Sequence, residues 1–481
     1  MLKKEVKIAI VGGGVAGATT AISLGQLGMN VTLFEKESSL VSGPPFCHLH
    51  AGGNLYREIS DEQCVTLLKQ SIDFAKFYPF VLDHRPTVIA LPTTDKGSPQ
   101  DLLPRLKLLV KEYDKLIQQD IKNKVLGESQ DYYKLYDKER LETLKKEKVP
   151  RMPKSSDEWM ISVAQHIDLE KIQFPLILVQ EYGLNLFRLA SSAKLALDNL
   201  DSVQLNLQTS VTDITKDAQK WQVTYQKEKM KEVETFDYLI NATGFRTGYI
   251  EDMLNIPCKR MVEFKAAYVS KWEQEEAILF PEIIFHGERG TPRGMGQFTP
   301  YPNGYFQLHG MTTDITLYED GLASNTAIKC QPELKEKFMT KIEKQWTQKE
   351  IEERTQNAIG HLAQFIPAFK SATVGSKPLF GAQQIPGDDP SLRVAEISFP
   401  IANYARCEIV KVSSAIDMVE AIIKEFVKLD YLDASAIGKN IRKYLEDISE
   451  EDLSDYAEVL AVERSYPASL AHRNVKEVTL F

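Results

Sequence analysis

The sequence predicts an α/β fold, and three observations near its start carry that prediction. A β-branched apolar run over residues 6–11 leads directly into the glycine motif Gly12-Gly-Gly-Val-Ala-Gly17. A helix-compatible segment follows over residues 18–28, and a second apolar run ends at Glu35. Strand, glycine turn, helix, strand and acid in this order are typical of the first βαβ unit of a Rossmann-like domain, which binds a dinucleotide.

The positions of the glycines indicate how this unit would bind its ligand. Gly12 allows the tight turn out of the strand, Gly14 lets the backbone approach a pyrophosphate, and Gly17 lets the helix pack close to the sheet. The helix N-terminus offers free N–H groups and the positive end of its dipole to the phosphates. Glu35, at the tip of the second strand, is placed to accept hydrogen bonds from a ribose hydroxyl. The predicted contacts are Gly12, Gly14, Val15, Ala16, Gly17, Glu35 and Lys36.

Length and composition bound the class of protein. With 481 residues the chain is too long for one hydrophobic core, so two domains are expected. The net charge of −9 argues against nucleic acid as a partner, because binding phosphates requires a basic face. The five cysteines form no CxxC pair, which argues against a zinc or redox motif and fits a reducing compartment.

Two further absences concern membranes and targeting. The first strand begins so close to Met1 that no room is left for a signal peptide. No uncharged apolar run is long enough to span a bilayer. We therefore expect a soluble cytoplasmic protein with no transmembrane segment and no metal site.

The rest of the chain alternates between helix-like and strand-like patterns. Residues 100–150 are rich in Lys and Glu, with apolar residues at helical spacing, which is typical of solvated amphipathic helices on the flank of a domain. Residues 236–244 form an apolar run that ends in small residues, as expected for a central parallel strand. Further strands are expected at 87–91, 203–207, 222–225 and 392–402, and as short pieces between Gly and Pro turns over 260–315. Further helices are expected at 64–77, 184–200, 333–370 and 408–427, with additional helical pattern and a weakly periodic tail over 430–481.

Four stretches of the chain together resemble one family. They are the glycine motif with Glu35, the strand end Ala242-Thr-Gly244, the aromatic strand 297–310 and the stretch Phe365-Ile-Pro-Ala-Phe369. Their order resembles that in the FAD-dependent oxidoreductases of the D-amino-acid oxidase type, and only the first motif is highly specific. The resemblance implies FAD as cofactor and a discontinuous Rossmann-like FAD-binding domain. It also implies an inserted mixed or antiparallel sheet that forms a substrate domain over the flavin.

The resemblance also implies domain boundaries and further cofactor contacts. The FAD-binding domain would comprise residues 1–85, 181–250 and 371–430, the substrate domain residues 86–180 and 251–370, and a C-terminal helical tail residues 431–481. Val211 would lie beside the adenine, and Thr243 and Gly244 at the carboxyl end of a strand near the cofactor. The family's usual glycine-rich stretch before the closing helix is replaced here by residues 400–409.

A single arrangement of strand, GxGxxG and helix is present. The glycine-rich stretch Gly287–Gly296 is followed by aromatic strand residues rather than by a helix. One nucleotide site indicates that electrons come from the substrate rather than from NAD(P)H. A plain NAD-binding dehydrogenase is the alternative for the same glycine motif.

The strand predicted over residues 305–309 supplies two candidate catalytic residues. Period-2 alternation places Tyr305, Gln307 and His309 on one face, and two apolar residues on the other. The polar face could form the roof of the flavin pocket, with Tyr305 and His309 as the catalytic candidates. The alternative is a solvated or hydrogen-bonded sheet face.

Arginines that follow predicted strands are candidates to clamp a substrate carboxylate in bidentate geometry. Arg246 follows the strand end at Gly244, Arg406 precedes the closing helix, and Arg293 is a third candidate. The alternative is that they are surface residues or structural ion pairs.

The Gly/Pro-rich loop 42–54 contributes two histidines, His48 and His50. The segment beginning at His50 resembles that of dimethylglycine-dehydrogenase-like members, which attach FAD covalently through this histidine. A noncovalent hydrogen bond from an imidazole is the alternative. For Cys407, the alternatives are a thioether link, as in sarcosine-oxidase-like members, and a buried inert thiol.

The sequence predicts an FAD-dependent oxidoreductase. It would oxidise a C–N or C–O bond of a small carboxylate-bearing substrate by hydride transfer to flavin N5, and pass electrons to O₂, a quinone or a carrier protein. One alternative is an FAD-binding scaffold, because residues 100–150 and 449–454 are highly charged. Another is a flavin monooxygenase, disfavoured because Gly387-Asp-Asp389 lies before the final predicted strand instead of ahead of the closing helix.

Overall fold

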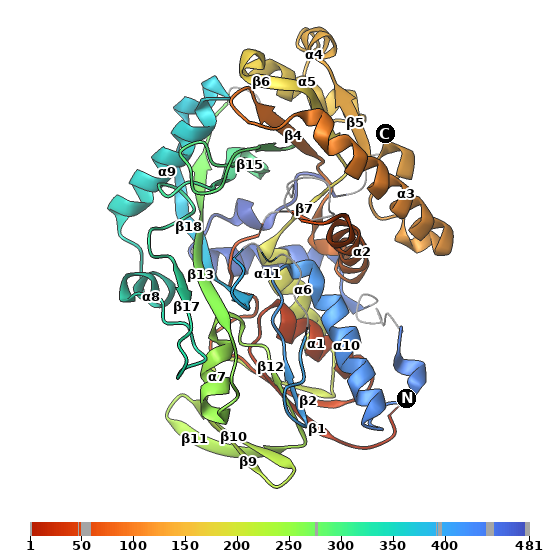
Figure 1. Cartoon of the computed structure of the whole chain (residues 1–481), viewed down its shortest axis with the longest axis vertical. Coiled ribbons are helices and arrows are strands. Elements are labelled where there is room, and N and C mark those ends of the chain that lie inside the picture. The colour runs from red at the N-terminus through yellow and green to blue at the C-terminus, as the bar shows by residue number, and fades with distance from the viewer. Residues whose placement is uncertain are drawn as a thin grey trace.

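The computed structural model describes residues 2–46, 48–49, 59–274, 278–390, 392, 397–438 and 447–476. These residues confirm the predicted α/β fold and form two large sheets, which occupy the lower and upper parts of the molecule in Figure 1. Within this part of the chain, no helix is both long and apolar enough to cross a bilayer.

The first sheet is five-stranded and parallel. Its order is β19 (Tyr404–Arg406), β12 (Tyr238–Asn241), β1 (Lys7–Val11), β2 (Asn30–Phe34) and β8 (Val203–Asn206). Alternation along β1 divides its side chains between two cores, with Ile8 and Ile10 in one and Ala9 and Val11 in the other. Because all five strands run the same way, the ends of β1, β2 and β12 meet at one edge, where α/β folds bind ligands.

Helices cover one face of this sheet and a three-stranded meander covers the other. On the helical side, α1 (Val15–Gln26) packs against α6 (Leu186–Asp198) and α10 (Ala415–Lys428). The meander consists of β9 (Thr209–Asp217), β10 (Lys220–Lys227) and β11 (Met230–Phe236). The sequence predicts only one of its strands, near β10, because most residues of β9 and β11 are at least partly exposed and show no apolar face.

The second sheet has nine strands and is mixed. Along its path lie β17 (Leu322–Ser324), β13 (Arg260–Lys271), β16 (Tyr305–Gly310), β15 (Gly296–Tyr301), β14 (Glu282–Phe285), β4 (Thr87–Pro92), β6 (Ile172–Val179) and β5 (Tyr133–Tyr136), and β18 (Thr373–Pro386) pairs with β13. Strands β14 and β4 pair in parallel, and the other pairings are antiparallel. In Figure 1 the long strand β13 reaches from this sheet toward the first.

The remaining helices surround the second sheet and its junction with the first. They are α2 (Asp61–Phe77), α3 (Leu103–Gln119), α4 (Lys138–Leu144), α5 (Ser156–His166), α7 (Thr247–Leu254), α8 (Glu336–Glu343) and α9 (Gln348–Ala363). As expected for the charged stretch 100–150, α3 is amphipathic and buries Leu106, Leu109 and Tyr113. The sequence does not predict β5 in the same stretch, because four residues give too short a pattern.

The last parallel strand lies later than predicted. Part of the expected strand 392–402 falls on residues 393–396, outside the described residues, and its described remainder forms only an isolated bridge, at Ser398. The edge strand is instead β19, which pairs with β12. The closing helix α10 accordingly begins at Ala415 and not at Glu408.

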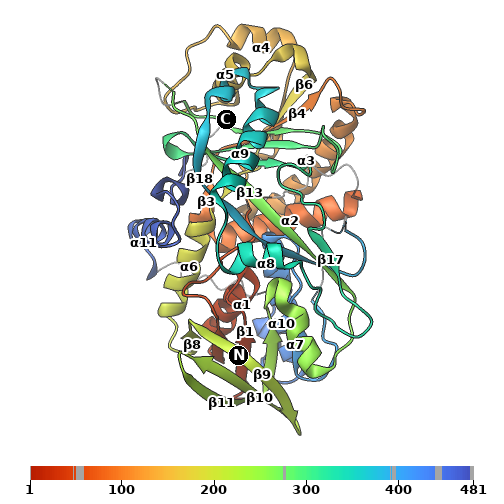
Figure 2. The ribbon, with the colours of Figure 1, turned by 90° about the vertical axis from the view of Figure 1, so that its left-hand side faces the viewer.

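The C-terminal segment is fastened to both sheets. Helix α11 (Glu450–Glu463) packs on α6, on one side of the molecule in Figure 2. After it, Arg464 donates hydrogen bonds to the carbonyl oxygens of Leu40 and Val41, at 2.5 and 3.0 Å, in the loop that follows β2. Tyr466 donates to the Pro378 carbonyl of β18 at 2.7 Å, and Asn474 donates to the Pro300 carbonyl of β15 at 3.0 Å. Hydrogen bonds from single side chains to distant carbonyl oxygens therefore hold the weakly periodic tail in place. Such bonds do not produce a periodic pattern in the sequence.

Candidate active site

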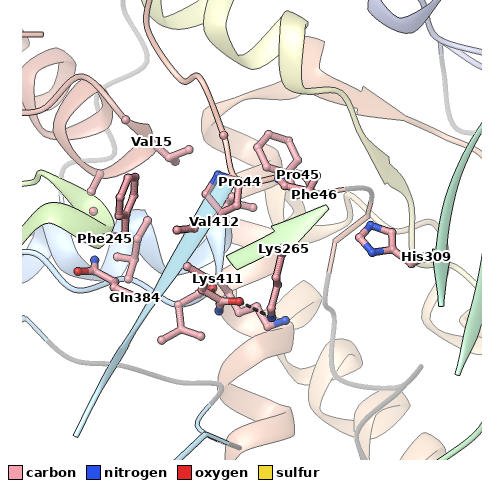
Figure 3. Close-up of a pocket in the computed structure, with 18 of the residues that line it drawn as sticks. Val15, Pro44, Pro45, Phe46, Phe245, Lys265, His309, Gln384, Lys411 and Val412 are labelled. Atoms are coloured by element: carbon pink, nitrogen blue, oxygen red, sulfur yellow. Dashed lines mark hydrogen bonds between the residues drawn. The ribbon is translucent and has the colours of Figure 1, made fainter. Parts of the chain in front are cut away.

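A cavity of about 490 Å³ lies where the ends of β1 and β12 face the second sheet. Its walls come from the start of α1, the loops 43–48 and 407–412, the turn after β12, and strands β13, β15, β16 and β18. Figure 3 shows Val15 and Phe245 toward one end of this cavity and His309 at the other, with Lys265 between them. The cavity therefore joins the predicted dinucleotide turn to the predicted catalytic strand.

The glycine turn has the shape that a pyrophosphate requires. A Cβ on Gly12, where φ is +102°, would lie 2.5 Å from the Ala242 carbonyl oxygen, and a Cβ on Gly17 would lie 1.9 Å from that of Gly12. A Cβ on Gly14 would meet no atom within 4 Å, and Gly14 lines the cavity together with Val15 and Ala16. The turn is therefore closed on its protein side and open on its cavity side, directly at the N-terminus of α1.

Glu35 lies at the end of β2 beside this turn. Its Oε2 accepts a hydrogen bond from the Gly13 N–H at 2.6 Å, and its Oε1 accepts one from the Glu37 N–H at 2.8 Å. Burial raises the pKa of Glu35, and the two backbone hydrogen bonds partly offset that rise. Each carboxylate oxygen keeps a second lone pair that a ribose hydroxyl could use. Lys36 is exposed and forms an ion pair with Glu37. Neither Glu35 nor Lys36 is among the residues that line the cavity.

The remaining predicted cofactor contacts divide into two groups. Gly244, in the left-handed region at φ +60°, lines the cavity, whereas Thr243 is turned to Asn241, to which its hydroxyl donates at 2.7 Å. Val211 lies on β9 and packs at the core beneath the meander. It is not among the residues that line the cavity.

His48 lines the cavity and is fixed by a buried carboxylate. Its Nδ1 lies 2.7 Å from Glu282 Oε1, and the two side chains are 1% and 0% exposed. Burial alone would raise the pKa of Glu282, but His48 and Arg85 outweigh this effect and lower it to about 2. His50, the other histidine of the loop, lies outside the described residues.

The strand with the two catalytic candidates has the predicted alternation. Phe306 and Leu308 of β16 belong to the core of the second sheet, and Gln307 and His309 are buried on the opposite face. His309 lines the cavity. Tyr305 does not, and its ring is covered instead by the Lys271 ammonium, 4.5 Å from its centroid.

The hydrogen bonds of β16 assign the tautomer of His309. The Tyr301 hydroxyl donates to Gln307 Oε1 at 3.2 Å, so the Gln307 amide nitrogen, 3.1 Å from His309 Nε2, is the donor to that ring atom. The ring proton then resides on Nδ1. This atom is buried and has no hydrogen-bond partner among the described residues. His309 therefore carries an N–H group that is unpaired within the described part of the chain.

Two predicted arginines are used elsewhere. The Arg406 guanidinium is bound by the buried carboxylates of Glu251 and Glu408, and Arg246 pairs with Glu343 at 2.5 Å. Neither arginine lines the cavity, and neither does Arg293. None of the three arginines therefore borders the cavity as a carboxylate clamp would. For Arg406 the structure instead matches the alternative of a structural ion pair.

The cations at the cavity come from positions that the sequence did not single out. Lys265 of β13 and Arg289 of the glycine-rich turn 287–296 both line it, as does Lys411. Glu263 lies between the first two: its Oε2 is 3.2 Å from Lys265 Nζ, and its Oε1 accepts from Arg289. Burial alone would raise the pKa of Glu263, but these two cations lower it below its usual value. The glycine-rich turn that carries Arg289 is recognisable in the sequence and could have indicated this part of the cavity. Its glycines allow close packing, since a Cβ on Gly294 would lie 2.2 Å from the Met311 carbonyl oxygen.

Cys407 also lines the cavity and is fully buried. Burial raises the pKa of its thiol, so the sulfur is protonated at neutral pH. This environment fits the inert-thiol alternative.

A second group of possible ligand atoms lies outside the cavity. The ligand atoms of Glu251, Cys258 and Cys330 lie within 4.8 Å of one another. Arg260 already donates to the Glu251 carboxylate at 2.6 Å, and burial raises the pKa of the Cys258 thiol. The carboxylate is thus paired and that thiol protonated, which does not favour a metal ion here.

Comparisons with solved structures agree with the fold described above. None of the curated proteins matches the chain. Among solved structures, the glycine oxidase of Geobacillus kaustophilus superposes with a TM-score of 0.56 at 12% identity, covering 91% of this chain and 99% of that one. The L-amino acid deaminase of Proteus vulgaris gives 0.56 at 14% identity, covering 91% and 97%. The glycerol-3-phosphate dehydrogenase of Bacillus halodurans, complexed with FAD, gives 0.55 at 13% identity, covering 97% and 74%.

These structures share the fold of this chain. The model of the family described as FAD dependent oxidoreductase matches residues 7–387, which is well over half of the sequence. The chain therefore belongs to the FAD-dependent oxidoreductases, and its cofactor is FAD.

Proposed function

We propose that this enzyme oxidises a C–N or C–O bond of a small carboxylate-bearing substrate held against Lys265, Arg289 and His309. The observation that carries the proposal is the charge of the cavity wall. The described residues that line the cavity include two lysines, an arginine and two histidines. No aspartate or glutamate is among these described lining residues. A carboxylate would be desolvated in this cavity and needs cationic partners there.

FAD, when bound, supplies the acceptor for the substrate hydride. The open side of the glycine turn and the first N–H groups of α1 would hold its pyrophosphate. Glu263 pairs with both Lys265 and Arg289 and so orients them. These two cations would bind the substrate carboxylate, and His309 would donate its Nδ1–H to the same anion. Apolar side chains such as Pro44, Phe46 and Met295 line the rest of the cavity and would keep water from the reacting carbon.

The structural relatives support the choice of bonds. Two are named for oxidation or deamination of amino acids, which alters a C–N bond, and one is named for dehydrogenation of glycerol 3-phosphate, which alters a C–O bond. All three named substrates carry a carboxylate or a phosphate. Identities of 12–14% leave the substrate of this chain to be found by experiment.

Anaerobic mixing of the FAD-loaded enzyme with a panel of small acids tests the proposal. Amino acids, hydroxy acids and glycerol 3-phosphate should be compared with their neutral amide, ester or dephosphorylated analogues. We expect an anionic member to bleach the oxidised flavin band and its neutral analogue to be much slower. Bleaching by neutral compounds alone would contradict the anionic substrate, and a flavin that no compound reduces would favour a scaffold.

The acceptor is tested in the same experiment. After reduction, O₂, a soluble quinone or a carrier protein is added, and the rate at which the flavin absorbance returns identifies the one that reacts. We propose that one of these three accepts the electrons, because the sequence has a single nucleotide-binding glycine motif.

A further inference from the structure

We propose that Glu282 holds His48 as an imidazolium, which places a fixed positive charge in the cavity wall for the anion that the cavity binds. His48 would then act directly on the bound anion, and Glu282 would be its positioning residue. The inference rests on the proposed function only for the nature of the bound anion. The charge of His48 itself is a property of the resting enzyme.

The hydrogen bonds of Glu282 come from three directions. Its Oε2 accepts from Arg85 Nη1 at 2.7 Å, and its Oε1 accepts from the Gln297 amide and faces His48 Nδ1 at 2.7 Å. Glu282 is fully buried, so its negative charge must be met by donors inside the protein. A proton on His48 Nδ1 makes the third contact a charge-assisted hydrogen bond.

The charges of the buried cluster also favour a second cation. Asp83 accepts from the Val475 N–H at 2.8 Å and from the Asn474 amide at 3.1 Å, and Arg85 lies 3.3 Å away. Burial raises the pKa of Asp83, and these donors counter that rise. With Asp83 and Glu282 ionised, two negative charges face the single positive charge of Arg85, and a protonated His48 supplies a second positive charge.

The other groups near His48 do not supply that charge. The ionisable side chains on the elements around it include Glu181 beside β7 (Gly183–Leu184), Glu282 of β14, His286 directly after β14, His309 of β16, Lys265 of β13 and Arg289 of the turn after β14. Asp83, His84 and Arg85 lie ahead of β4, and burial lowers the pKa of His84 to about 4, so its ring is neutral. Glu181 adds a further buried carboxylate, hydrogen-bonded by Tyr132 at 3.1 Å. Lys265 and Arg289 are already shared with Glu263. His309 is separated from His48 by Gln297, its partner in the strand register.

A neutral His48 is the competing arrangement. The single proton of a neutral ring could lie on Nδ1, where it would still donate to Glu282, or on Nε2, in which case Nδ1 could accept from the Gln297 amide nitrogen at 3.1 Å. The two arrangements differ in the number of protons on the ring, which can be measured directly.

The experiment uses FAD-loaded enzyme labelled with ¹⁵N in its histidine rings. The His48 signal is assigned by its loss in His48→Gln. We expect both ring nitrogens of His48 to be protonated throughout pH 6–8 in the wild type, and Glu282→Gln to convert the ring to the neutral form within this range. A neutral ring in the wild type, or a ring unaffected by Glu282→Gln, would overturn the proposal.

A second measurement tests the action on an anion. Benzoate, a carboxylate without an oxidisable C–N or C–O bond, is titrated into the enzyme and its Kd is read from the shift of the flavin absorption spectrum. We expect Glu282→Gln and His48→Gln each to raise this Kd at least tenfold. The control is Asp157→Asn, which removes another ion-paired carboxylate far from the cavity, bound to Lys134 at 2.7 Å and to Arg140 at 2.5 Å.

The outcomes separate this proposal from the proposed function. Equal benzoate affinity in all variants, or no binding by the wild type, would overturn the role of His48 toward the anion. If Glu282→Gln does not fold, the ring protonation of wild-type His48 still decides its charge. Both measurements are made without turnover, so a failed search for substrates leaves them intact.

Discussion

The backbone N–H of Gly13 donates a hydrogen bond to the carboxylate of Glu35 at 2.6 Å and so ties the glycine turn to the end of β2. One carboxylate therefore shapes the turn and also lies where a ribose is expected. The structure shows the first role, and the second stays a prediction from the sequence.

Replacing Glu35 by alanine should weaken FAD binding while the fold persists. Losing hydrogen bonds to a charged group costs about 1.5–3 kcal/mol, which corresponds to a roughly tenfold to 100-fold higher Kd. Fluorescence titration of the apoprotein with FAD measures the change. Lys36→Met is the control, because the Lys36 side chain is exposed and pairs with Glu37 instead of contacting the glycine turn. A Kd in Glu35→Ala equal to that of the wild type would rule out the ribose role.

Gly14→Leu should lose FAD binding, whereas Gly17→Ala should lose stability. A side chain at Gly14 meets open space, so the variant should fold with the Tm of the flavin-free wild type but purify without flavin colour. A Cβ at Gly17 would lie 1.9 Å from the Gly12 carbonyl oxygen, so even alanine should lower stability, by about 1–3 kcal/mol. Thermal unfolding and flavin content of the purified proteins distinguish the two, and full flavin content in Gly14→Leu would show that the pyrophosphate binds elsewhere.

Arg289→Met should raise KM for an anionic substrate roughly tenfold to 100-fold, as expected for a lost charged hydrogen bond. Its flavin content should stay at the wild-type level. Steady-state kinetics with a substrate found in the acid panel provide the measurement. Arg246→Met is the matched control, since Arg246 pairs with Glu343 outside the cavity; a larger effect at Arg246 than at Arg289 would contradict the placement of the clamp.

Glu282 should contribute to stability in a pH-dependent way. Its pKa is about 2 in the folded enzyme, against an ordinary value of 4.5, so its contribution is fully present above pH 4.5 and is lost as the pH falls toward 2. Over this interval the unfolded chain holds up to one more proton than the folded one, a slope of up to about 1.4 kcal/mol per pH unit. Urea unfolding from pH 5 to pH 3 should therefore give a shallower loss of stability in Glu282→Gln, and parallel curves would show that the ion pairs are absent in solution.

Arg464→Met should loosen the loop after β2. Arg464 is half-buried, and this burial lowers its pKa to about 10. Its guanidinium donates to the carbonyl oxygens of Leu40 and Val41. We expect weaker FAD retention and faster proteolysis within this loop. Val459→Ser, an exposed position on α11, is the control, and identical FAD retention in both variants would show that the loop is held without the arginine.

The parts of the site that could be predicted are those with short-range causes. The glycine turn depends on residues within one βαβ unit, and the direction of His309 depends on alternation with Phe306 and Leu308 along one strand. Both patterns are visible in a few consecutive residues.

The cations of the proposed clamp could not be predicted, because their positions depend on pairings between distant segments. Lys265 and Arg289 both pair with Glu263. Arg406 instead binds Glu251, which lies 155 positions earlier in the chain. An arginine next to a strand end looks the same in the sequence whether its partner is a substrate or a buried carboxylate. The strand β19 was missed for a related reason, since three residues give no usable periodicity.

The anchoring of the loop after β2 by Arg464 has a consequence for biosynthesis. The side chain that fixes the loop after the glycine turn and Glu35 is synthesised more than 400 residues after the loop itself. The edge strand β19 and helix α10 are also late products. Domains generally fold as units during synthesis, yet the loop beside this nucleotide site gains its anchor only after Arg464 has been synthesised. Nascent chains that stop before Arg464 therefore leave this loop without its anchor.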